Sequence, residues 1–149
     1  MKIIVDTNII FSSLLNSNST IGDLLFNSDK YFEFYSCIYM RYEIHKHWER
    51  LKKISKLSDH QLEISYTQIL TKLKFINEEI IPVETWLASE KIAKEIDIDD
   101  TDFIALAKFL RGTLWTGDKV LYNGLKKINF NKLINTAELL SLRTTKMAK

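Results

Sequence analysis

At three places in this sequence an aspartate stands where an apolar strand pattern gives way to a helical one. Asp6 follows the run Ile-Ile-Val at residues 3–5, Asp118 follows the run at residues 113–115, and Asp100 precedes a compact apolar stretch. The first run has no alternation of polar and apolar residues, which is typical of a strand buried on both faces in a parallel sheet. In such sheets ligands bind at the carboxyl ends of the strands. We therefore expect the three carboxylates to meet at one edge.

The spacing of apolar residues predicts strands interleaved with helices. We expect strands at residues 2–5, 32–37, 80–81, 113–115 and 133–134, and helices at residues 9–15, 21–26, 38–54, 58–75, 85–96, 103–110, 119–125 and from 136 onward. Gly112 has the position of a residue that ends the helix before it. This order predicts an α/β fold, a three-layer α/β/α sandwich with a central, mostly parallel sheet.

Length and composition predict one domain and a soluble protein. A chain of 149 residues that is 46% hydrophobic can bury one core, so we expect a single domain over residues 1–149. Cys37 is the only cysteine, which excludes an internal disulfide and fits a reducing cytoplasm. The N-terminus has no signal-peptide core, and no apolar run approaches the roughly 20 residues of a membrane span. We expect a cytoplasmic protein that does not bind a membrane.

Each candidate carboxylate also has a simpler explanation. Asp6 could serve only as an N-cap, and the acids Asp97, Asp99, Asp100 and Asp102 could only stabilise the start of a helix. Several ionised carboxylates at one edge, however, repel one another and need compensating positive charge, most economically a divalent metal ion. The sequence therefore favours the hypothesis of a metal-dependent phosphodiesterase.

Basic residues are concentrated in two parts of the chain. One set falls on the predicted helix at residues 38–54 and just beyond it, and the other lies near the C-terminus: Arg41, Lys46, Arg50, Lys52, Lys53 and Lys56 in the first, and Lys126, Lys127, Lys132, Arg143, Lys146 and Lys149 in the second. Both patterns fit a phosphate-binding surface and equally fit solvated helix faces. We select Arg50, Lys52 and Lys53 as the candidate nucleic-acid-binding residues.

Four segments together resemble the PIN domain, a family of metal-dependent ribonucleases that includes the VapC-type toxins of toxin–antitoxin pairs. The segments are DTN after the first strand, RYEIHKH, DIDDTDFIALA and LWTGDKVL, which span roughly residues 2–125 in the right order. The resemblance implies that Asp6, Glu43, Asp100 and Asp118 are the catalytic and metal-binding acids. It gives Asn8 and Thr116 supporting roles and leaves Asp97 and Asp102 as secondary ligands.

The resemblance also implies an activity and partners. It implies an endoribonuclease that uses one or two Mg²⁺ or Mn²⁺ ions, acts on RNA, forms a homodimer and is paired with an antitoxin protein. Two alternatives stay open, namely a non-catalytic RNA- or protein-binding module of the same fold and a receiver domain. A receiver also gathers aspartates at strand ends, but it needs a lysine at the end of a later strand, and Lys119 falls in a predicted helix instead.

Overall fold

The computed structural model describes all of residues 1–149 and is built around one five-stranded sheet. The strands are β1 (Lys2–Val5), β2 (Glu33–Cys37), β3 (Leu73–Ile76), β4 (Thr113–Trp115) and β5 (Leu133–Ile134). Their order is β3-β2-β1-β4-β5, and every neighbouring pair is parallel. Ile3, Ile4 and Val5 are completely buried, because β1 is the central strand.

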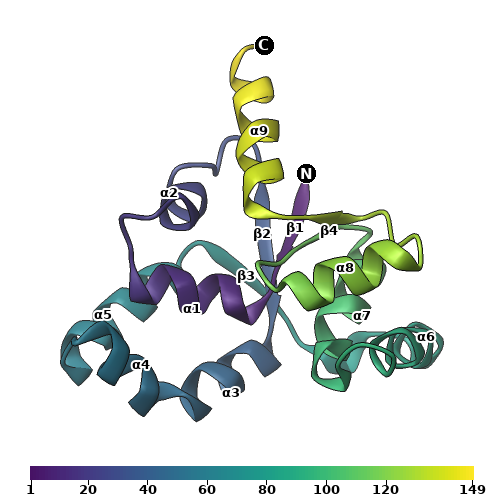
Figure 1. Cartoon of the computed structure of the whole chain (residues 1–149), viewed down its shortest axis with the longest axis horizontal. Coiled ribbons are helices and arrows are strands. Elements are labelled where there is room, and N and C mark those ends of the chain that lie inside the picture. The colour runs from purple at the N-terminus through teal and green to yellow at the C-terminus, as the bar shows by residue number, and fades with distance from the viewer.

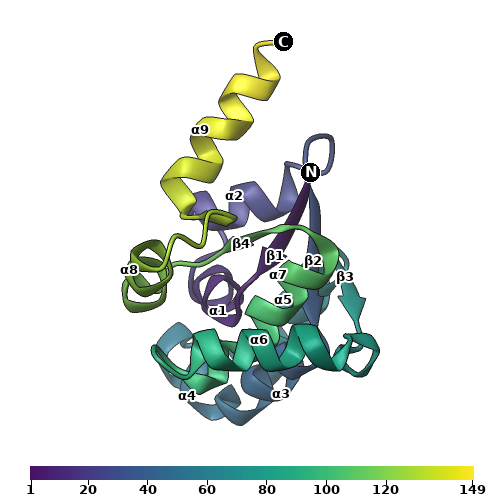
Figure 2. The same ribbon diagram turned by 90° about the vertical axis from the view of Figure 1, so that its right-hand side faces the viewer.

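Helices cover both faces of this sheet, which confirms the predicted three-layer α/β/α sandwich. The first group comprises α1 (Thr7–Leu15), α2 (Thr20–Phe26), α3 (Ile38–Lys46), α4 (Trp48–Ser55) and α5 (Asp59–Leu70), and the second comprises α6 (Val83–Ala93), α7 (Thr101–Leu110) and α8 (Lys119–Lys127). Figure 1 shows the first group on the left of the sheet and the second on the right. Viewed from the right (Figure 2), α6 and α7 lie in front of the strands, and α7 packs directly on β1, β2 and β4.

The strand order places a switch point beside β1. The chain builds outward from β1 through β2 to β3 and then returns to the other side of β1 to form β4 and β5. Connections that leave in opposite directions lie on opposite faces, because βαβ crossovers are right-handed. The crevice between β1 and β4, at their carboxyl ends, is where such a sheet binds ligands. In Figure 1 β1 runs downward from the N-terminus, so this edge lies at its lower end, where α1 begins.

The last helix, α9 (Thr136–Met147), is held to β4 and α2 by side-chain contacts. The buried Trp115 donates its indole N–H to Thr136 Oγ1 at 3.1 Å, which fixes the start of α9 against β4. Further along, Arg143 forms an ion pair with Asp23 of α2 at 2.5 Å and donates to Ser28 Oγ at 3.1 Å. Beyond these contacts α9 projects from the body of the molecule (Figures 1 and 2). None of the helices is long and apolar enough to cross a bilayer.

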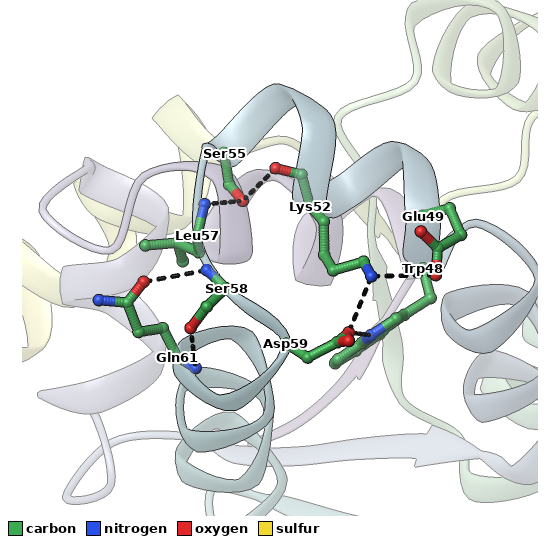
Figure 3. Close-up of polar contacts among 8 residues, drawn as sticks. All are labelled: Trp48, Glu49, Lys52, Ser55, Leu57, Ser58, Asp59 and Gln61. Atoms are coloured by element: carbon green, nitrogen blue, oxygen red, sulfur yellow. Dashed lines mark hydrogen bonds and ion pairs between the residues drawn. The ribbon is translucent and has the colours of Figure 1, made fainter.

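Three of the predictions of secondary structure made from the sequence are wrong. The expected helix at residues 38–54 is two helices, α3 and α4, that meet at His47. The expected helix at residues 58–75 begins correctly, since Ser58 and Gln61 form a capping box (Figure 3), but it ends at Leu70, and β3 follows. No strand forms at residues 80–81, because Ile80 ends a single 3₁₀ turn at Glu78–Ile80. The strand β3 was missed because its pairing partner, β2, is distant in sequence.

Gly112 has a different role from the one expected. Arg111 takes the left-handed conformation that ends α7, with φ of 54°, and Gly112 does not adopt a positive φ. A Cβ atom on Gly112 would collide with Ile4 Cδ1 and would lie 3.1 Å from the carbonyl oxygen of Lys2. The missing side chain therefore lets the start of β4 approach β1 closely.

Candidate functional site

Asp6 lies at the end of β1 and is 5% exposed. It occupies the N-cap position of α1 but makes no side-chain capping hydrogen bond. Its Oδ2 atom instead accepts a hydrogen bond from Thr116 Oγ1, at 2.7 Å, from the loop after β4. A capping role therefore does not explain this buried carboxylate.

Asn8 and Thr116 hold the loops after β1 and β4 together. Asn8 Oδ1 accepts from the Gly117 backbone N–H at 3.1 Å, and Asn8 Nδ2 donates to Thr116 Oγ1 at 3.4 Å. Thr116 Oγ1 also accepts from the Asp118 backbone N–H at 3.0 Å. Asp118 Oδ1 caps α8 by accepting from two backbone N–H groups, which leaves its Oδ2 atom without a protein partner. Both predicted supporting residues thus position Asp6 and Asp118.

A glutamate in the middle of a helix is usually solvated, but Glu43 on α3 is half-buried. Its Oε1 atom accepts a hydrogen bond from Thr7 Oγ1 at 2.5 Å. Burial raises the pKa of Glu43, and the charges of Asp99 and Asp97 raise it further. Thr7 was not among the predicted site residues, and the only available signal was its position between Asp6 and Asn8.

Asp100 completes a cluster of four carboxylates. It stands before α7 and makes no side-chain capping bond. Burial raises its pKa to about 8, and the charges of Asp6, Asp118 and Glu43 contribute to the shift. Burial likewise raises the pKa of Asp6 to about 7, although the hydrogen bond from Thr116 lowers it. The four acids that the resemblance selected thus act on one another electrostatically, although no three of them hold their ligand atoms within 4.8 Å of one another.

These four acids fit a divalent cation. Asp6, Glu43, Asp100 and Asp118 form no ion pair with a lysine, arginine or histidine. Carboxylates close to one another favour protonation unless positive charge, such as that of a metal ion, neutralises them. Their oxygen atoms are the hard ligands that Mg²⁺ and Mn²⁺ prefer.

The other acids of the segment at residues 97–102 have different surroundings. Asp97 Oδ1 accepts from the Asp99 backbone N–H at 3.0 Å, and the charge of Asp97 acts on Asp100 and Glu43. Asp102 pairs with Glu78, and burial together with this hydrogen bond raises the pKa of Asp102 to about 7. Asp97 is thus close to the cluster of four acids, whereas the main partner of Asp102 lies outside it.

Cys37, Glu78 and Asp102 form a second group whose potential ligand atoms lie within 4.8 Å of one another. Both oxygens of Glu78 already accept backbone N–H groups at the start of α3, at 2.9 and 2.8 Å. Burial raises the pKa of the Cys37 thiol, which favours the neutral form rather than the thiolate that binds metals. This second group therefore caps α3 and suits a hard cation poorly.

Lys52, one of three predicted nucleic-acid-binding residues, is occupied by carboxylates. Figure 3 shows its side chain between Glu49 and Asp59, with Nζ 3.0 Å from an oxygen of each. Trp48 Nε1 also donates to Asp59 Oδ1, at 3.0 Å. Lys52 therefore connects α4 to the start of α5, and its charge is already compensated.

Arg50 and Lys53 are exposed and form no ion pair. Arg50 lines a groove of about 260 Å³ between α1 and α4 that begins at Asn8. A second cavity, of about 440 Å³, is lined by Thr116, Asp118 and Lys119. Each hollow thus includes residues of the site, Asn8 in the first and Thr116 and Asp118 in the second, and Arg50 lines the first.

The family model of the PIN domain matches residues 4–146, so this chain belongs to the PIN domain family. This match confirms the predicted resemblance over a longer segment than the four motifs cover. It excludes the alternative of a receiver domain. A search of curated protein sequences found no match.

Solved structures share the fold at low sequence identity. VapBC2 from Rickettsia felis, bound to a DNA fragment from their promoter, is 17% identical, with a TM-score of 0.66 over 91% of this chain and 97% of that chain. PAE2754 from Pyrobaculum aerophilum is 13% identical, with a TM-score of 0.68 over 97% and 90%. A toxin–antitoxin complex from Klebsiella pneumoniae is 14% identical, with a TM-score of 0.59 over 89% and 96%.

The raised pKa values predict how stability depends on pH. Because the folded-state pKa values of Asp6 and Asp100 lie above those of the unfolded chain, the folded protein binds more protons between about pH 4 and pH 8. The free energy of unfolding of the metal-free protein should therefore fall as the pH rises through this range. Asp6→Asn should make this decrease in the free energy of unfolding smaller by about 2–4 kcal/mol. Urea unfolding in EDTA at pH 5 and pH 8 measures the effect.

Glu90, exposed on α6 and free of ion pairs, provides the control. Glu90→Gln should keep the pH dependence of the parent protein. Mg²⁺ at pH 8 should stabilise the parent and not Asp6→Asn, since binding to the folded state alone raises stability. Equal losses of stability from pH 5 to pH 8 in the parent and in Asp6→Asn would contradict the prediction.

Proposed function

We propose that this protein is a metal-dependent endoribonuclease. The observation that carries the proposal is the cluster of Asp6, Glu43, Asp100 and Asp118 at the switch point of the sheet, none of which forms an ion pair with a cationic side chain. Membership of the PIN domain family supports a nuclease activity. The buried free thiol of Cys37 is compatible with the cytoplasm, where such an enzyme would meet RNA.

In the proposed mechanism Asp6, Asp100 and Asp118 would hold one or two Mg²⁺ or Mn²⁺ ions. Such an ion lowers the pKa of water and stabilises negative charge on a phosphate group. Thr116 orients the Asp6 carboxylate, and Asn8 fixes the loop that carries Asp118. Glu43 contributes a ligand or orients the attacking water through Oε2, because Thr7 occupies its Oε1 atom. No side chain needs to act as a nucleophile.

RNA is the substrate that the surroundings of the acids favour. The groove that contains Arg50 is also lined by Asn8, and the cavity that contains Lys119 is also lined by Asp118, so a phosphate backbone bound at the acids would have a cationic side chain in each hollow. Of the residues selected from the sequence, Arg50 is the one that lines a hollow beside the site.

A role as the toxin of a toxin–antitoxin pair follows as a second part of the proposal. Two of the solved structures with this fold are described as VapBC2 and as a toxin–antitoxin complex. We also propose a homodimer, because Ile38 and Tyr42 on α3 are 49% and 59% exposed, and Val83 and Leu87 on α6 are 69% and 58% exposed. Large apolar side chains exposed on the surface are typical of protein interfaces.

The first prediction from this proposal concerns the metal ion. The purified chain should cleave single-stranded or structured RNA in Mg²⁺ or Mn²⁺ and should lose this activity in EDTA. Asp6→Asn should lower the cleavage rate by about 100-fold or more, because it removes a charged ligand of the ion. Glu90→Gln should cleave like the parent. Unchanged cleavage in EDTA would reject the mechanism, and RNA binding without cleavage would favour the non-catalytic alternative.

A second prediction separates Arg50 from Lys52. Arg50→Ala should weaken RNA binding and reduce its salt dependence, because Arg50 is exposed beside the acids and has no carboxylate partner. Lys52→Ala should alter RNA binding less and should instead lower the melting temperature, since its charge already contacts Glu49 and Asp59. Fluorescence anisotropy over a salt series and thermal unfolding compare these two variants of equal charge. Equal losses of affinity would contradict the distinction.

A third prediction concerns partners. Light scattering should find two chains per particle for the protein alone, and Leu87→Lys should yield monomers. The product of the neighbouring reading frame, when co-expressed, should co-purify with the protein and suppress RNA cleavage. A monomeric parent protein would reject the dimer, and cleavage unaffected by the neighbouring product would reject that product as the antitoxin.

A further inference from the structure

A second hollow with nucleotide-binding character lies at the amino-terminal edge of the sheet, away from the acids. It has a volume of about 490 Å³ and is bounded by the end of α7 and the loop between α8 and β5. We infer that this hollow, the α7–β5 cavity, binds one nucleotide of single-stranded RNA. The inference rests on the proposed function for the identity of the nucleic acid, and it adds a binding site that the catalytic cluster does not contain.

Positive charge without a counter-ion is the first observation. Lys108, Arg111 and Lys132 line the cavity, all three are exposed, and none forms an ion pair. Lys132 Nζ donates to the carbonyl oxygen of Arg111 at 3.0 Å, which holds these two residues together. No carboxylate lines the cavity. Three neighbouring cations without an acid are a suitable environment for a phosphate group.

Other hollows of the surface differ in this respect. The cavity between α6 and α8 contains Glu95, the one beside β4 contains Asp118, and the one below β3 contains Asp29 and Glu33. The groove between α1 and α4 is lined by a single arginine, Arg50, and by no lysine. The combination of three cations and no acid is therefore a property of the α7–β5 cavity and not of the surface in general.

The remaining lining residues match the other parts of a nucleotide. Phe130 is partly buried and packs against the core, so its ring is held in place while one part stays accessible. Bases of single-stranded RNA stack on such aromatic side chains, whatever their sequence. Asn129 and Asn131 flank Phe130 and offer amide donors and acceptors. Arg111 and Asn129 both have left-handed backbones, so the two helix ends turn at this cavity.

The position of the cavity favours a single strand that continues to the catalytic cluster. Gly112 borders the cavity and Asp118 lies in the cluster, and six residues of extended chain correspond to about 20 Å. A strand of a few nucleotides can span this distance, so a bound nucleotide here would anchor RNA whose scissile phosphate reaches the acids. A duplex keeps its bases stacked inside and would not present one to Phe130.

Binding of a fluorescent single-stranded oligouridine of about ten nucleotides tests the inference. Anisotropy is measured in EDTA over a salt series for the full chain and for Lys108→Gln/Arg111→Asn/Lys132→Gln. Asparagine tolerates the left-handed conformation of residue 111, and glutamine at 132 retains a donor for the Arg111 carbonyl. The triple variant should bind about 10-fold more weakly, and the slope of log affinity against log salt should fall by about 2.

Two further variants separate the contributions of charge and stacking. Lys30→Gln/Lys94→Gln/Lys149→Gln removes the same charge from exposed lysines without ion pairs and should change affinity by less than about 2-fold. Phe130→Leu should weaken binding by about 5-fold and leave the salt slope unchanged. Equal affinities of the two triple variants would overturn the inference. A DNA duplex that binds more tightly than the oligouridine would overturn it as well.

Cleavage measured in parallel distinguishes this inference from the proposed function. At saturating RNA with Mg²⁺ the triple variant at the α7–β5 cavity should cleave at the parent rate, because the four acids are unchanged. Cleavage by the parent together with unaltered RNA binding by this variant rejects the cavity alone. Weakened binding by this variant without any cleavage by the parent supports the cavity and rejects the nuclease.

Discussion

The hydrogen bond from Thr116 to Asp6 connects the ends of β1 and β4 at the switch point of the sheet. Burial disfavours the ionised form of Asp6, and the hydroxyl group of Thr116 partly offsets this cost by donating to it. Thr116 then accepts from the Asp118 backbone, and Asn8 bonds the adjoining Gly117. The positions of both aspartates thus depend on one threonine that is completely buried.

The two groups of acids in this structure differ in their partners. The Glu78 carboxylate is saturated by two backbone N–H groups and a pairing with Asp102, so it stabilises the start of α3. Asp6, Glu43, Asp100 and Asp118 form no ion pair with a cationic side chain, and Asp118 keeps an oxygen without a protein donor. The unsatisfied charge, rather than the number of acids, distinguishes the candidate metal site.

The same distinction applies to the basic residues. Lys52 belongs to the densest basic segment of the sequence, yet it contacts two carboxylates and fixes the α4–α5 corner. Lys132 is separated along the chain from Lys108 and Arg111, so the sequence does not indicate that they form a group. The fold of α7 and the α8–β5 loop brings all three to one cavity. Local charge density in the sequence is therefore a poor guide to free positive charge, because neighbouring elements supply the counter-ions.

The sequence alone determined the fold class and the candidate acids of this protein. The run Ile3-Ile4-Val5 predicted a fully buried strand, and polar residues that follow such strands collect at one edge of a parallel sheet. Local periodicity could not predict β3 or the break at His47, because β3 is defined by its pairing with β2 and because apolar spacing continues across the break. Only the tertiary structure decided that Thr7 contacts Glu43, that Asp102 pairs with Glu78 and that Lys52 is neutralised. Each of these contacts joins residues of different elements. Whether such residues meet is decided by the packing of the elements and not by their spacing in the sequence.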